Sequence, residues 1–249
     1  GGPFEVGTFF AVFAISSLSM YFYTGKRIYL VLFLYFSAFV FLSTKRNSMI
    51  GYIFTLGLFL YLYKNHINIK KLFLIGILTG LVSGLLIGYL YQKDIRFRAM
   101  LEVVENPEDK HLDTAFSLRW TLFWQGVEVI KRDFQEHNIV ALFVGHGVFP
   151  GARLEPKSAN GTTYESVIFI SEMTSRGLIG LFGIMFMMFS YYRFLLSLRN
   201  KLLQKDVVVL SVMMPLSILF AGSIFSGFWD ALMPLYFLMF GVGEKFIKS

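Results

Sequence analysis

The sequence of 249 residues contains no cysteine, which excludes a disulfide framework and a thiolate metal site. Charged residues are scarce, at 16% of the chain, whereas a soluble domain carries about a quarter. An initiator Met and a signal peptide with a basic n-region are also missing. Because the chain opens at Gly1-Gly2-Pro3, which resembles the middle of a loop, we expect a longer protein with earlier membrane helices.

Apolar residues dominate what is present. They make up 55% of the chain, Phe alone occurs 29 times, and the mean hydropathy is +0.61. The apolar runs are continuous instead of alternating as barrel strands do, and a helix needs roughly 17–25 residues to span hydrocarbon. We therefore predict an all-α, polytopic integral membrane bundle of seven helices, over residues 6–23, 28–42, 49–63, 72–91, 177–198, 207–225 and 228–243.

A long polar insert interrupts these runs. It divides the chain into a first membrane helix bundle (1–91, four helices), an extracytoplasmic loop (92–164) and a second bundle (165–249, three helices). The insert holds two of the three Trp residues and three of the four His residues, namely Trp120, Trp124, His111, His137 and His146. Since everything else is suited to lipid, we expect the chemistry at this insert and the membrane face beneath it.

The net charge of +7 is explained by membrane topology and does not indicate nucleic-acid binding. The insert is nearly neutral, with nine Lys/Arg against ten Asp/Glu. With the N-terminus outside, the cytoplasmic connections contain only Asp206 and Glu244 against ten cations: Lys26, Arg27, Lys64, Lys70, Lys71, Arg199, Lys201, Lys205, Lys245 and Lys248. Short basic loops inside and a balanced large loop outside follow the positive-inside rule.

The insert also contains the pattern of an amphipathic helix over 116–137. Its apolar face consists of Phe116, Trp120, Phe123, Val127, Ile130 and Phe134. With Trp124 at its flank, this face is suited to the headgroup region of a membrane. Arg119 lies at the edge of the face, where its guanidinium either binds a lipid phosphate in bidentate fashion or snorkels to ordinary headgroups.

Glycines mark three further places. Every fourth residue of one apolar run is a glycine, which predicts close helix packing along Gly76, Gly80, Gly84 and Gly88. Gly177 and Gly180 predict similar packing. His146 lies in the turn-rich stretch 145–151 and is either a general base or a solvated loop residue. The stretch lacks the spacing of a nucleotide-binding glycine loop, so we do not expect it to hold a phosphate.

The junction between insert and second bundle carries a carboxylate with two interpretations. Thr162 and Glu165 have the spacing of a helix capping box. Glu165 is also placed to be a partly desolvated carboxylate at the outer membrane edge that accepts a proton. Glu172 and Arg176 have the spacing of an ion pair within one helix.

A short outer connection, residues 43–48, contains Lys45 and Arg46. Cations are disfavoured on this side of the membrane, so Arg46 either binds an anionic ligand from the outer leaflet or lies among headgroups. Asp230, in another short outer turn, is a weaker candidate of the same type.

These features resemble the O-antigen ligase and polymerase superfamily of bacterial envelope glycan assembly, and they come in that family's order. Gly2-Pro3-Phe4 precedes the first helix, and residues 43–48 stand where the family has a Ser/Arg-rich connection. The outer loop then carries Arg119-Trp120 and a Gly-x-Gly turn at Gly145 and Gly147. A short motif finally precedes a helix containing the sequence Gly-Leu-Ile-Gly-Leu, residues 177–181.

The resemblance implies roles for particular residues. Extracytoplasmic arginines hold the pyrophosphate of a polyprenyl-linked glycan in that family, which assigns this role to Arg46 and Arg119, without a metal or another cofactor. The ligases have a His at the loop-to-helix junction, whereas this chain has Tyr164-Glu165-Ser166. We therefore expect Glu165 to be the base of a repeat-unit polymerase. We expect the substrate to contact Lys45, Trp120, Trp124, His146 and Tyr164, of which Trp124 and Tyr164 are placed to stack on sugars.

The reaction expected from the resemblance joins two lipid-linked glycans outside the bacterial inner (plasma) membrane, on its periplasmic or exterior side. A chain-length regulator and a flippase are expected partners. One alternative is a ligase that transfers the finished glycan to a lipid A core or a protein. A flippase or transporter is an alternative of another class, but it requires ionisable residues or helix breaks near mid-membrane. In the predicted spans, only Pro215 is a candidate for such a break.

Overall fold

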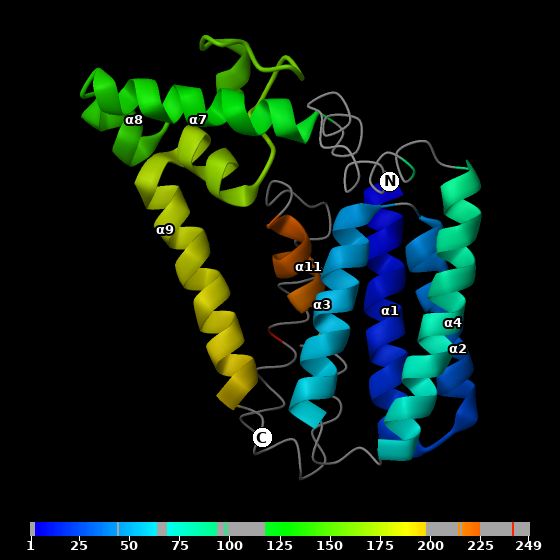
Figure 1. Ribbon diagram of the computed structural model, residues 1–249. Helices are drawn as coiled ribbons and strands as arrows, with labels where there is room; N and C mark the ends of the chain where they lie inside the picture. Colours follow the sequence, from blue (N-terminus) through cyan, green and yellow to red (C-terminus); the bar gives the residue numbers. More distant parts are fainter. Residues whose placement is uncertain are drawn as a thin grey trace. The chain divides into compact units, whose positions relative to one another are not determined.

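The computed structural model describes residues 3–43, 45–63, 69–93, 98, 118–197, 214, 216–224 and 241. Within these residues the regular elements are helices, which confirms the predicted helical class (Figure 1). They are α1 (Pro3–Thr24), α2 (Arg27–Leu42), α3 (Arg46–Tyr63), α4 (Ile69–Lys93), α7 (Arg119–Gln135), α8 (Ile139–Val144), the 3-10 turn η1 (Pro150–Ala152), α9 (Ile168–Ser197) and α11 (Leu216–Ser223).

Helices form where the apolar runs predict them, because a continuous apolar run can bury its backbone only if the helix satisfies its own hydrogen bonds. Two described stretches, Val6–Thr24 and Ile168–Ser197, are long and apolar enough to cross a membrane. Arg27–Leu42 and Asn47–Leu62 are shorter apolar helices. All of the predicted run 228–243 except residue 241 lies outside the described residues, as do Pro215 and Asp230, so the total of seven spans stays a prediction.

The chain divides into two compact units. The first contains residues 1–89, 191–222 and 229–249, and the second contains residues 90–190 and 223–228. Helix α9 contributes its longer, earlier part to the second unit and its last turns to the first. The predicted boundaries at 91/92 and 164/165 remain predictions, although the division at Leu90 falls next to the first of them.

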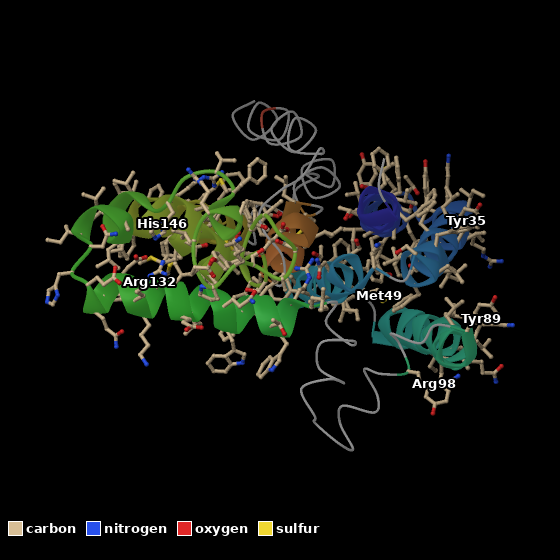
Figure 2. The ribbon with its side chains drawn as sticks, turned by 90° about the horizontal axis from the view of Figure 1, so that it is seen from above. Tyr35, Met49, Tyr89, Arg98, Arg132 and His146 are labelled. Atoms are coloured by element: carbon tan, nitrogen blue, oxygen red, sulfur yellow. The ribbon has the colours of Figure 1, made fainter. Side chains whose placement is uncertain are left out.

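In the first unit, α1 packs against both α2 and α3. Phe10 and Phe13 of α1 stack with the rings of Phe36 and Phe39 of α2, with centroids 4.9–6.1 Å apart. The outer faces of α2 and α4 carry Tyr35 and Tyr89, which project away from the helices and are more than half exposed (Figure 2).

Small residues bring the turn between α2 and α3 close to its neighbours. A Cβ on Gly7 of α1 would lie 2.6 Å from Ser43 Oγ, and Thr8 Oγ1 and Ser48 Oγ lie 3.0 Å apart. On the other side, a Cβ on Gly222 of α11 would lie 2.8 Å from the Asn47 carbonyl. The connection 43–48 is therefore clamped between α1 and α11.

The glycine stripe of α4 is predicted to pack closely against another helix. No atom lies within 4 Å of a Cβ built on Gly76, Gly80, Gly84 or Gly88 in the part of the chain that the structure describes. The described residues therefore supply no partner for this stripe, and the close helix contact stays a prediction, because a stripe of small residues permits an approach without supplying a partner.

The second unit is built around α7. A Cβ on Gly126 would meet the Ile170 side chain at 2.3 Å and Tyr164 Cβ at 3.2 Å, so α7 lies directly on the start of α9 and on the segment before it. The buried face of α7 consists of Leu122, Gly126, Val129 and Asp133. This face differs from the predicted aromatic one, whose Phe134 is exposed. Residues 119–135 confirm a helix within the predicted range, and Phe116 lies outside the described residues.

A kink in α9 fixes the segment that follows α8. Gly177 has φ 64° and ψ −160°, a conformation that suits glycine and interrupts the helical hydrogen bonds. The carbonyls of Thr174 and Ser175 consequently accept bonds from the amides of His146 (2.9 Å) and Gly147 (2.8 Å). These two amides are thus committed to α9, in agreement with the prediction that this stretch does not hold a phosphate.

Candidate functional site

Arg119 and Glu165 lie together in the second unit. Arg119 is the first residue of α7, and its Nη1 donates a hydrogen bond to the Ser166 carbonyl at 3.3 Å. Burial lowers the pKa of the Arg119 guanidinium from its usual value, and the negative charge of Glu165 opposes this shift. An arginine stays protonated at neutral pH even so. The structure therefore brings a half-buried cation to the backbone next to a half-buried carboxylate and within its electrostatic influence, although 46 positions separate Arg119 from Glu165 in the sequence.

The backbone on both sides holds this pair in place. Leu118 has φ 63°, a left-handed conformation that a leucine rarely adopts, and it turns the chain into α7 immediately before Arg119. Conformations of this kind cost about 1–3 kcal/mol and cluster at functional sites. Ser166 is buried, and the Ile168 amide after it donates to the Ile224 carbonyl at 3.2 Å. Both halves of the pair therefore lie next to fixed backbone.

The capping-box interpretation of Glu165 is wrong. Helix α9 begins at Ile168, so Thr162 and Glu165 both precede it. The Thr162 amide and hydroxyl both donate to Asn160 Oδ1, at 2.9 and 3.2 Å, within a tight polar turn. Because a side chain that caps a helix must lie at its first turn, this role is not open to Glu165. The other interpretation of Glu165, a proton-accepting carboxylate, stays a prediction.

The predicted aromatic contacts divide into two kinds. Trp120 and Trp124 form an edge-to-face pair with centroids 5.7 Å apart, and Trp124 is about half exposed at 52%. Tyr164 is fully buried, and its hydroxyl donates to the Pro156 carbonyl at 2.6 Å. Burial raises the pKa of this phenol, so it remains a neutral donor. Stacking on a sugar needs an exposed ring face, so the stacking predicted for Tyr164 is corrected, while Trp124 retains an accessible face.

His146 is not a solvated loop residue. Its Nε2 lies 2.7 Å from Oδ2 of Asp133, which is buried on α7. About 20 Å of helix separates Asp133 from Arg119, at 1.5 Å per residue. The imidazole therefore ties the segment after α8 to α7 and lies away from the Arg119–Glu165 pair. Sequence reasoning missed this contact. The only hint is that Asp133 lies on the buried face of α7, since its partner His146 belongs to a different segment.

The predicted ion pair of Glu172 and Arg176 is confirmed, with Nη1 and Oε2 2.7 Å apart. Glu172 is buried in the first part of α9, whereas the Arg176 side chain is largely exposed. The pair stabilises the turn of α9 just before the kink.

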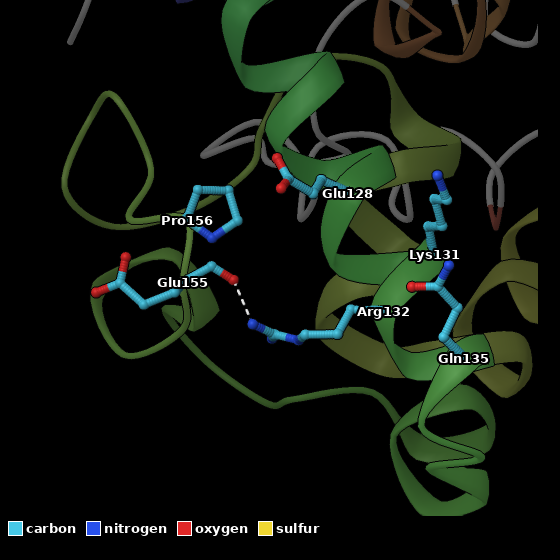
Figure 3. A pocket seen from close by; sticks show the side chains of 6 residues that line it. All are labelled: Glu128, Lys131, Arg132, Gln135, Glu155 and Pro156. Atoms are coloured by element: carbon cyan, nitrogen blue, oxygen red, sulfur yellow. Dashed lines mark hydrogen bonds between the residues drawn. The ribbon is translucent and has the colours of Figure 1, made fainter.

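A polar pocket of about 480 Å³ lies between α7 and the segment after η1. Arg132 donates from Nη1 to the Glu155 carbonyl, which closes one side of it (Figure 3). Its lining combines two carboxylates, two cations, an amide and a proline ring: Glu128, Lys131, Arg132, Gln135, Glu155 and Pro156. Such a set offers both hydrogen-bond donors and hydrogen-bond acceptors, and the proline ring adds one apolar face. No sequence pattern indicates this pocket, because its two sides are brought together only by the fold.

Arg46 and Lys45 belong to the first unit. Arg46 is the first residue of α3, between the half-buried Lys45 and the buried Ser48 that contacts α1. The contacts of Ser43, Asn47 and Ser48 with α1 and α11 hold the start of α3, where Arg46 lies. Joint action of Arg46 with Arg119 remains a prediction.

Comparison with known proteins adds the family. Residues 28–135 match the sequence model of the O-antigen ligase family. This match supports a place in the O-antigen ligase/polymerase superfamily for these residues. The matched range includes Lys45, Arg46 and Arg119, and it ends before Glu165. The superfamily resemblance expected from the order of motifs is thereby confirmed.

One relative extends over nearly the whole chain. An uncharacterized protein of Aquifex aeolicus (strain VF5) is 33% identical over 250 residues, which cover 98% of this chain. The chain spans 64% of that relative's length. No solved structure matches the chain.

Proposed function

We propose that the protein is an extracytoplasmic glycosyltransferase that polymerises polyprenyl-pyrophosphate-linked oligosaccharide repeat units into a surface polysaccharide such as O-antigen, capsule or exopolysaccharide. The observation that carries the proposal is the hydrogen bond from Arg119 to the Ser166 carbonyl, which places the guanidinium beside the residue next to Glu165, in a chain that matches the family model. A cation beside a carboxylate supplies the two things that glycosyl transfer from a pyrophosphate needs. These are charge stabilisation of the leaving group and a base for the attacking hydroxyl.

In the proposed reaction, the pyrophosphate of the donor lies against Arg119 and Arg46. A hydroxyl at the non-reducing end of a second lipid-linked unit attacks the anomeric carbon of the donor glycan. The bond between this carbon and the pyrophosphate oxygen breaks, and polyprenyl pyrophosphate leaves with the electron pair. Glu165 accepts the proton of the attacking hydroxyl. The guanidinium of Arg119 binds the pyrophosphate with two parallel hydrogen bonds. Because Arg119 is partly buried, its charge acts on the pyrophosphate more strongly than it would in water.

The same helix offers places for the sugars. Trp124 presents an exposed ring near Arg119, and an aromatic face packs against the C–H groups of a sugar. Further along α7, the pocket at Glu128 and Arg132 offers carboxylates, cations and an amide to sugar hydroxyls. We assign to Trp124 and this pocket the glycan portion of a substrate. Lys45 and Trp120 are retained as substrate contacts on sequence grounds.

A ligase is the second candidate, because the matching family model is described as O-antigen ligase. The residues at the junction, Tyr164-Glu165-Ser166, favour the polymerase, since they place a carboxylate where the ligases have a His. A ligase would pass the finished glycan to a lipid A core or a protein. The two reactions share the donor and differ in the acceptor.

The proposed setting is the bacterial inner membrane, with the site on the periplasmic or exterior face. The two long apolar stretches and the superfamily support a membrane-associated protein, and the charge distribution of the loops supports the orientation. A flippase that delivers the lipid-linked unit and a chain-length regulator are the proposed partners.

Deletion of the full-length gene tests the proposal, with surface glycan and lipid-linked intermediates sized separately. A polymerase predicts surface glycan that stops at one repeat unit. Full-length chains that accumulate on the lipid without transfer would identify a ligase. Single lipid-linked units that accumulate on the cytoplasmic face would overturn the enzyme and identify a flippase.

A further inference from the structure

The segment after α7 presents an apolar surface that the proposed reaction does not use. Seven large apolar side chains between residues 134 and 149 are each more than half exposed: Phe134, Ile139, Val140, Phe143, Val144, Val148 and Phe149. We name these seven residues the α8 patch. A protein surface in contact with water rarely leaves so many large apolar groups exposed within one short segment.

The segment from Asn138 to Ala152 has almost no ionisable side chains on its surface. From Asn138 to Ala152 the sequence contains no Asp, Glu, Lys or Arg. Its one ionisable side chain, His146, is turned onto the buried Asp133, with Nε2 and Oδ2 2.7 Å apart. This is the reverse of a water-exposed loop, in which polar side chains point outward and apolar ones are buried.

The fold holds the α8 patch beside the kink of α9. A Cβ on Gly145 would lie 2.4 Å from the Arg176 amide nitrogen, and one on Gly177 would lie 2.5 Å from the Phe143 carbonyl carbon. The two segments therefore touch backbone to backbone. Beyond the kink, α9 exposes Phe182 and Phe186, at 63% and 72%, within the stretch that is long and apolar enough to cross a membrane. The patch thus lies where the exposed apolar surface of α9 begins.

We propose that the α8 patch inserts into the acyl chains of the extracytoplasmic leaflet and anchors this unit to the bilayer beside α9. Lipid fits the surface because the patch consists of apolar side chains alone and adjoins the exposed apolar surface of a candidate membrane helix. The anchor holds α7, and with it Arg119 and Glu165, at a fixed height above the membrane, where a lipid-linked pyrophosphate lies.

Site-directed spin labelling tests the proposal, because this chain contains no cysteine that would compete for the label. Val140→Cys and Phe143→Cys are labelled singly in the full-length protein and reconstituted into phospholipid nanodiscs. Power saturation then measures the access of oxygen, which partitions into lipid, and of a neutral nickel chelate, which stays in water. Phe186→Cys supplies the lipid reference, and Glu136→Cys, at the exposed end of α7, supplies the water reference.

The expected oxygen-to-nickel ratio at residues 140 and 143 equals that at residue 186 and is several-fold above that at residue 136. Nickel access equal to that at residue 136 overturns the proposal. Low access of both reagents overturns it as well, because it means that protein covers the patch. Both side chains are more than half exposed, so their replacement leaves the packed interior intact. The outcome is independent of glycan chemistry, so it stands or fails separately from the proposed function.

Discussion

Helix α7 has a polar partner near each end, and the two pairs differ in burial and in position. Near its start, Arg119 is half-buried beside Glu165, and its contact with Ser166 goes to a backbone carbonyl. Near its end, Asp133 is buried and lies 2.7 Å from the His146 ring nitrogen. The charges of Arg119 and Glu165 remain accessible to a substrate, whereas the polar atoms of Asp133 and His146 are enclosed in the protein.

This difference indicates how one helix serves both chemistry and structure. A buried, hydrogen-bonded pair is costly to break and fixes the segment that it holds. A half-buried pair keeps charges strong without sealing them from a substrate. We therefore expect substitutions at the start of α7 to change turnover and substitutions at its end to change stability.

Glu165→Gln gives the largest expected effect. It removes the proposed proton acceptor and keeps the size of the side chain, so transfer should slow by about 10²–10⁴-fold. The measurement is the rate of chain extension by the purified full-length protein on a lipid-linked repeat unit. Glu136→Gln, an exposed carboxylate at the end of α7, is the matched control and should leave the rate unchanged. Equal rates for Glu165→Gln and the wild type would remove Glu165 from the mechanism.

Arg119→Gln should slow transfer by about 10²–10³-fold, because one preorganised donor to the developing charge is lost. Arg119→Lys keeps the charge without the planar fork and should recover part of the rate. Lys157→Gln removes an exposed cation from the same unit and serves as the control. An equal fall in Arg119→Gln and Lys157→Gln, with Arg119→Lys at the wild-type rate, would mean that only the net charge of the unit matters.

Asp133→Ala should act on stability. It leaves the partly buried His146 nitrogen without its partner, which costs about 1–3 kcal/mol of the free energy of unfolding. Thermal unfolding in detergent, compared with Glu136→Ala, measures the loss, and the transfer rate per folded molecule should not change. A loss of rate without a loss of stability would place this pair in the catalytic machinery and abolish the distinction between the two ends.

Glu128→Gln gives the smallest expected effect, because it weakens one hydrogen bond to a sugar in an open pocket. KM should rise by less than about tenfold, equivalent to at most ~1.4 kcal/mol, while kcat stays constant. Steady-state kinetics with repeat units of increasing length measures both constants. A fall in kcat at constant KM would contradict a binding role for the pocket between the two ends.

The sequence predicted several of these elements for physical reasons. Long apolar runs form helices because the backbone then satisfies its own hydrogen bonds, and α1 to α4 follow the predicted ranges within a few residues. The pair Glu172–Arg176 was also predictable, since residues four apart lie on one helix face. Both inferences depend only on local geometry.

Other expectations failed where local spacing has more than one outcome. Thr162 and Glu165 have capping-box spacing, but the same spacing occurs in the loop before α9. The spacing of α7 did not indicate which face packs on α9: the helix packs through Gly126, where the absence of a side chain admits Ile170, while the aromatic face expected at the membrane surface stays a prediction. A hydrophobic pattern shows which residues can be buried, and the partner surface decides which of them are.

By itself, the sequence determined that this protein is helical and rich in membrane-compatible segments, that a polar insert separates its apolar runs, and that it resembles the superfamily whose model it matches. Only the tertiary structure decided that Arg119 lies beside Glu165, that His146 is held by Asp133, and that residues 139–149 turn their apolar side chains outward. The physical reason is the distance along the chain between the residues that interact. Helix formation is set by neighbours within a few residues, whereas each of these contacts or exposures depends on how segments far apart in the chain pack against α7 and α9.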